Sequence, residues 1–170
     1  MLRSTQRDPR VLFDRWYRQP IQKLKEVPSG DGAFVALIIG CMLYERYATS
    51  LLQANSRKAN TEAVVSQLAT DFGADTETAR VFWDMMRSGL AHSGQPKVQE
   101  RGRNSGVGWR FNHGFTHPMT LERDAQTGEP VCLLVQPWTF ADRVVELWQQ
   151  RPDLLDACPS FPWGKIHTYG

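Results

Sequence analysis

The sequence predicts one mainly α-helical domain, an antiparallel helical bundle with a small β-hairpin insert before its last helix. Apolar residues recur at steps of three and four through several segments, which is the period of a helix with one buried face. Between the last two of these segments the pattern changes to short β-rich runs separated by turn residues. The 170 residues, 41% hydrophobic and 22% charged, suit a single domain with one core.

The first predicted element is a basic helical segment, residues 8–26. Asp8 can cap a helix whose first position is Pro9, and Pro20 is expected to interrupt that helix. Seven basic residues against three acidic ones give residues 1–26 a charge of +4. On a chain whose net charge is only +2, such a stretch either attracts a phosphate backbone or forms an ordinary solvated surface.

The bundle itself is predicted over residues 33–92 and 138–151. Its longest helix, near residues 33–54, has a first half that is apolar on every side, so we expect other elements to surround it. The apolar stretch 33–44 is shorter than the roughly 18 residues that a membrane span needs, and Glu45 ends it. We therefore expect a buried helix in a soluble, cytoplasmic protein.

Two more helices follow the longest one. Asn60 can cap a helix that ends at Gly73, and Asp75 can start another that ends near residues 89–94. We predict at least four helices around one core, with these residues inside it: Phe34, Leu37, Ile38, Val65, Leu68, Phe82, Met86, Val144 and Leu147.

The β insert is predicted at residues 107–135, as a hairpin or as three short strands. Its turn is expected at residues 126–129. Thr139 and Asp142 have the spacing of a capping box for the last helix. Residues 152–170 are expected to form an irregular tail.

The chemistry of the chain is expected at Arg87-Ser88-Gly89-Leu90-Ala91-His92. A permanent cation lies close in sequence to a titratable imidazole, where a helix gives way to a loop. The arginine fork can hold a phosphate through two hydrogen bonds, and an imidazole can transfer a proton near neutral pH. With the 2′-OH of RNA as the nucleophile, these two groups are a minimal set for metal-free RNA cleavage.

An arginine, four intervening residues and a histidine, late in a helical bundle, resemble the HEPN superfamily of small prokaryotic ribonuclease domains. The string MMRSGLAHSGQPK carries the resemblance, which covers roughly residues 10–150. The sequence departs from the family at Ser88, where Asn, Asp or His is common, and at Gly94, where some toxin members have Tyr.

The resemblance implies a metal-independent endoribonuclease in which two protomers of a homodimer pool their Arg87 and His92 side chains. It also implies a toxin or phage-defence setting, RNA as substrate, and a possible antitoxin or complex partner. We expect no metal, no cofactor and no membrane partner. A non-catalytic HEPN-like subunit that binds or assembles into a larger complex is the alternative.

Supporting residues are expected around this pair. Asp84, one turn before Arg87, can pair with it as part of an ordinary surface, and His92 can serve only as a cation at a helix end. Glu45 is a candidate partner for Arg87. The remaining supporting or RNA-binding candidates are Ser88, Lys97, Arg101 and Arg103.

Other chemistry-bearing residues have weaker patterns. His113 and His117 are four residues apart, but Gly114 and Pro118 argue against a helix that would join them in a metal site.

The aromatic residues Trp109 and Phe111 alternate with the basic Arg110, so they either stack bases or pack the insert onto the bundle. Cys41 and Cys132 are expected to be buried thiols in a reducing compartment.

Overall fold

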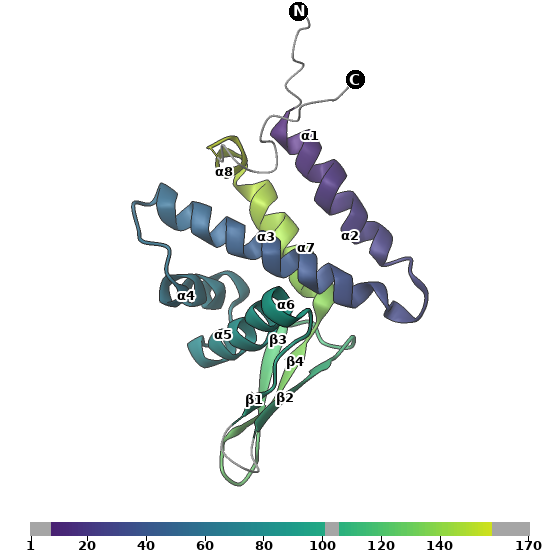
Figure 1. Ribbon diagram of the computed structural model, residues 1–170, viewed down its shortest axis with the longest axis vertical. Helices are drawn as coiled ribbons and strands as arrows, with labels where there is room; N and C mark the ends of the chain where they lie inside the picture. The colour runs from purple at the N-terminus through teal and green to yellow at the C-terminus, as the bar shows by residue number, and fades with distance from the viewer. Residues whose placement is uncertain (1–7, 101–105, 158–170) are drawn as a thin grey trace, which may run out of the picture.

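The computed structural model describes residues 8–100 and 106–157, and these form a helical bundle with a small sheet at one end (Figure 1). The mainly α-helical class is therefore confirmed. Helices surround the central helix α3 (Gly32–Ala54), and the sheet extends away from the end of the bundle that carries α5 and α6 (Figure 1).

The N-terminal segment is one continuous helix from Pro9 to Leu24. It comprises α1 (Pro9–Phe13), a π-helical turn η1 (Asp14–Arg18) and α2 (Gln19–Leu24). Asp8 caps it as predicted, with its carboxylate accepting from the Arg10 N–H at 2.9 Å. The predicted interruption at Pro20 is wrong: Pro20 lies inside the helix, directly after the wider π turn. A π turn changes the i→i−4 pairing just where proline has no N–H to offer.

Helix α3 is the core helix of the domain, and its closest partner is α7 (Pro137–Gln150). By length and composition α3 could cross a membrane, but more than half of its most apolar window is buried inside the protein, as in the core helix of a soluble protein. The expectation that its first half is surrounded is wrong, because Val35 is 42% exposed and Met42 is 68% exposed. One side of this apolar helix faces solvent.

A short 3₁₀ turn, η2 (Pro28–Gly30), precedes α3, and two helical units follow it: α4 (Thr61–Phe72), and the run of α5 (Thr76–Phe82), π turn η3 (Trp83–Arg87) and α6 (Ser88–Ser93). The predicted caps are confirmed. The Asn60 side chain accepts from the Ala63 N–H, Asp75 accepts from Thr78, and Gly73 ends α4 in the left-handed conformation.

The insert is a small mixed sheet with the strand order β1-β2-β4-β3. Its strands are β1 (Gln99–Glu100), β2 (Gly106–Phe111), β3 (Met119–Arg123) and β4 (Pro130–Val135). Strands β3 and β4 form the predicted hairpin, whereas β2 joins β4 in parallel. The three predicted strands are present, and β1 adds a two-residue antiparallel edge to β2.

The last long helix, α7, begins differently from the prediction. Its N-cap is Gln136, whose side chain accepts from the Trp138 N–H, and Pro137 takes the first position. Asp142 forms no capping box and instead accepts hydrogen bonds from Lys25 and Gln22, which tie α7 to α2. The predicted irregular tail begins with a helix, α8 (Pro152–Ala157), and residues 158–170 lie outside the described part of the chain.

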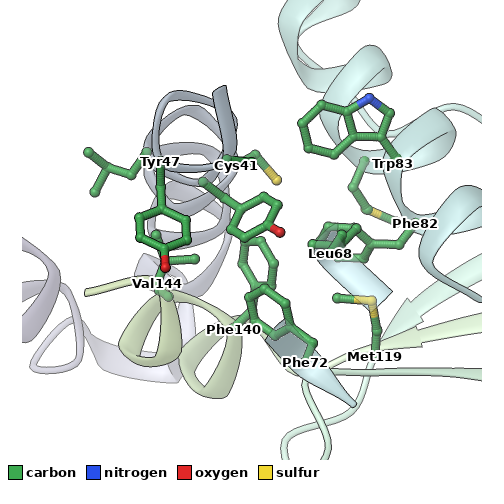
Figure 2. Packing of buried hydrophobic residues seen from close by; sticks show 14 of the residues in the cluster. Cys41, Tyr47, Leu68, Phe72, Phe82, Trp83, Met119, Phe140 and Val144 are labelled. Carbon is green, nitrogen blue, oxygen red and sulfur yellow. The ribbon is translucent and has the colours of Figure 1, made fainter. Parts of the chain in front are cut away.

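Aromatic rings fill the centre of the bundle (Figure 2). Phe140 of α7 stacks on Phe72 at 4.9 Å between centroids and contacts Phe82 at 4.8 Å and Tyr44 at 6.4 Å. The predicted core is confirmed except at Phe34 and Ile38, which are only partly buried. Gly40 permits this packing, since a Cβ there would lie 3.1 Å from the Phe140 ring.

Candidate functional site

Arg87 is fixed against α3 by a carboxylate 42 positions earlier in the chain. Its Nε donates to Glu45 Oε2 at 2.9 Å, and its Nη2 donates to Glu45 Oε1. The guanidinium carbon lies 5.6 Å from the centroid of the buried Trp83 ring, a cation–π distance. Arg87 is thus a held cation with 25% of its side chain exposed, paired with Glu45 rather than with Asp84.

The turn that carries Arg87 is wider than an α-helical turn, and the chain that follows α6 folds back onto it. The N–H of Lys97 donates to the Met85 carbonyl at 2.9 Å. At Gly89 a Cβ would lie 2.5 Å from the Lys97 nitrogen, so only glycine allows this close approach. The returning segment therefore fixes the far side of the helix that presents Arg87.

His92 lies in the last turn of α6, two residues before Gly94, which ends the helix in the left-handed conformation. Its side chain is exposed, and no described residue forms a hydrogen bond or ion pair with it. Five residues of α-helix turn a side chain by about 140° and advance it by about 7.5 Å. Arg87 and His92 of one chain therefore project from different sides of the same helix.

The structure brings only some of the other predicted site residues close to Arg87. Glu45 and Arg87 are brought together, while Asp84 and Ser88 lie half-buried beside Arg87 on the same helical run, and Lys97 is exposed. Arg101 and Arg103 lie outside the described residues.

Trp83 is not among the site residues that the sequence predicts. Its spacing of four residues before Arg87 was the available signal that the ring would lie under the guanidinium.

The weaker candidates take structural roles. Trp109 and Phe111 are partly buried and pack on the hydrophobic core, while Arg110 pairs with Glu122. His113 and His117 lie in an exposed loop between β2 and β3. Within residues 8–100 and 106–157, no group of three or more metal-binding side chains comes together.

The two described cysteines differ in how far they are buried. Cys41 is buried, and this burial raises the pKa of its thiol far above the usual range, although the nearby Arg87 opposes the shift. Cys132 was predicted to be buried but is only half-buried.

A second polar cluster joins α3 to the end of α4 beside a cavity of about 360 Å³. Asp71 accepts from the Tyr44 hydroxyl at 2.9 Å and from the Gln67 amide at 2.9 Å. Burial raises the pKa of the Asp71 carboxyl, against the effect of these two donors. The two donors therefore offset part of the cost of burying the Asp71 carboxylate.

Tyr44→Phe should lower the free energy of unfolding by about 1–3 kcal/mol at neutral pH, because a half-buried carboxylate loses a donor. Asp71 binds a proton more readily in the folded state, so the cost of its ionised form disappears as the pH falls through its raised pKa. The destabilisation should therefore shrink in acid. Urea unfolding at several pH values measures this destabilisation, and Tyr47→Phe, which removes a hydroxyl from another buried ring, is the control. An equal loss for both variants at every pH would contradict the assignment.

Comparisons of the chain with protein-family models, with curated proteins and with solved structures find no match. The chemistry of the site is therefore inferred from its residues and their arrangement.

Proposed function

We propose that this protein is a metal-independent RNA endonuclease that acts as a homodimer. The observation that carries the proposal is the contrast between the two motif residues. Arg87 is half-buried and contacts Glu45 and Trp83, whereas His92 is exposed and bonded to no described side chain. A fixed cation suits binding of a phosphate, and an accessible imidazole suits proton transfer.

The reaction follows from these groups. Glu45 occupies the Nε and Nη2 edge of Arg87, which leaves Nη1 and the second Nη2 proton for a phosphate oxygen. The 2′-OH of the substrate loses its proton to an imidazole and attacks the adjacent phosphorus. The 5′-oxygen leaves with a proton from a second imidazole. Arg87 stabilises the extra negative charge that develops on the phosphate in the transition state.

Two copies are needed for this scheme. One chain supplies one His92, whereas the reaction uses an acid and a base at the same time. Arg87 and His92 of one chain also project about 140° apart, which hinders their meeting on one phosphate. A symmetric dimer doubles both groups and can bring the side chains of different copies into one groove.

A non-catalytic binding subunit is the second candidate, and one observation favours it. The bidentate pairing with Glu45 already neutralises Arg87, as expected for an arginine with a structural role. The two candidates differ in whether RNA is broken. A cytoplasmic toxin or phage-defence role, with an antitoxin or larger complex as partner, belongs to the proposal and rests on the HEPN resemblance.

The experiment is an incubation of the purified protein with an RNA and with the same sequence made entirely of 2′-deoxynucleotides, both in EDTA. We expect the RNA to be cut and the DNA to stay intact, because only the RNA carries the nucleophile. Products should end in 2′,3′-cyclic phosphate and 5′-hydroxyl groups. Cleavage of both polymers, or cleavage that EDTA abolishes, would contradict the proposed chemistry.

A further inference from the structure

The solvent-facing side of α3 carries an apolar stripe that the other described elements leave partly uncovered. Met42 is 68% exposed, the largest value among the large apolar side chains described, and Val35 is 42% exposed. Ile38 and Ile39 between them are half-buried. These four residues are spaced so that they share one side of the helix. An exposed apolar surface of this kind marks a contact with another molecule.

The stripe has opposite charges at its two ends. Asp31 is exposed four residues before Val35, and Arg46 is half-buried four residues after Met42. In chain order the surface consists of Asp31, Val35, the pair Ile38 and Ile39, Met42, and Arg46. When a second copy of the stripe lies antiparallel to the first, Asp31 lies opposite Arg46 of the other copy, and Val35 lies opposite Met42. The stripe is therefore complementary to an antiparallel copy of itself, which is what a two-fold homodimer interface requires.

We propose that this α3 stripe, from Asp31 to Arg46, is the surface on which a second copy of the chain docks in antiparallel orientation. The symmetry axis passes between Ile38 and Ile39. The stripe extends over fifteen residue steps, about 22 Å of helix. Val35 then packs on Met42 of the partner subunit, and the unlike charges at the ends disfavour a parallel arrangement.

The same interface gives the candidate site its second half, and this step rests on the proposed function. Glu45 holds Arg87 at the edge of the stripe. The run from α5 to α6 points in the opposite direction to α3 (Figure 1), so α6, which follows Arg87, continues toward the N-terminal half of α3. When a two-fold axis perpendicular to the helices relates two antiparallel copies of α3, the stripe edge that carries Glu45 and Arg87 lies on the same side of the dimer in both copies. Both copies of α6, the helix that carries His92, therefore lie on one side of the dimer.

Sedimentation of the full chain without RNA tests the interface. We expect a dimer at tens of micromolar, and Met42→Asp should raise its dissociation constant by about a hundredfold, because the buried charge enters the interface twice. Val11→Asp is the control, since Val11 is 57% exposed on α1 and away from the stripe. A wild-type monomer, or a Met42→Asp dimer of unchanged affinity, would overturn the proposal.

Disulfide cross-linking tests the register and does not depend on the folding of the charged variant. A mixture of Val35→Cys and Met42→Cys chains should form a 35–42 disulfide between chains under mild oxidation, identified by peptide mapping. Its absence, with a dimer present, would place the interface elsewhere. A dimer with this cross-link but no RNA cleavage would leave the interface standing and remove the proposed function. A dimer that cleaves RNA without this cross-link would keep the proposed function and overturn the interface.

Discussion

His92→Ala should lower the rate of RNA cleavage by about a hundredfold or more, the usual effect of removing a proton-transfer group. The loss should appear in kcat rather than in RNA affinity, because the imidazole acts on protons in the transition state. The melting temperature should stay nearly unchanged, since the side chain is exposed at a helix end and no described residue bonds to it. Single-turnover cleavage and thermal unfolding measure the two effects.

His117→Ala is the matched control for this substitution. His117 is also exposed, but it lies in the loop between β2 and β3. It should cleave RNA at the wild-type rate. Full activity in His92→Ala, or an equal loss in both variants, would remove His92 from the reaction. A large fall in stability of His92→Ala would instead show that the residue only closes α6.

Arg87→Lys should reduce cleavage by about ten- to a hundredfold, the scale of losing one hydrogen bond to a charged group. A lysine keeps the charge but cannot donate two hydrogen bonds to Glu45 from one edge and others to a phosphate from a second edge. Because Arg87 is only 25% exposed and paired, its replacement by Ala would also leave Glu45 without its partner. The Lys variant is therefore the cleaner test, and urea unfolding should show only a modest loss.

Arg80→Lys is the control for the loss of an arginine fork. Arg80 lies on α5, seven residues before Arg87, and donates to Glu62 through its Nη2 group, whereas Arg87 donates to Glu45 through two nitrogens. It should leave cleavage unchanged. If Arg80→Lys and Arg87→Lys reduced activity equally, the effect would come from the stability of the bundle rather than from phosphate binding.

Local signals in the sequence predicted most helix ends. Asp8, Asn60, Asp75 and Gly73 act as caps because their side chains or backbone freedom satisfy groups within one turn. The same reasoning failed at Pro20, where a π turn accommodates the proline, and at Thr139, where Gln136 caps the helix instead. Both failures depend on competing local geometries that residue types alone do not separate.

Long-range features were less accessible. The sequence placed Glu45 after an apolar run and Arg87 on a polar helix face, but nothing in the spacing showed that α3 and η3 would bring them together. The alternation of apolar residues predicts strands but not which strands pair, so the parallel pairing of β2 with β4 could not be predicted.

Because the first half of α3 is apolar on every side, the sequence predicts that other elements surround it. The exposure of Met42 shows that the described part of one chain does not cover this helix completely. The proposed second copy is the element that would.

The central claim, that two copies complete one cleavage site, is tested most directly by subunit exchange. Wild-type protein is mixed with a tenfold excess of His92→Ala chains and allowed to exchange, and RNA cleavage per wild-type chain is measured in EDTA. Nearly all wild-type chains then pair with a variant partner, so pooled His92 side chains predict that activity falls by about tenfold. Cleavage per wild-type chain that stays constant, with mixed dimers demonstrated, would contradict the claim and place the whole reaction within one chain.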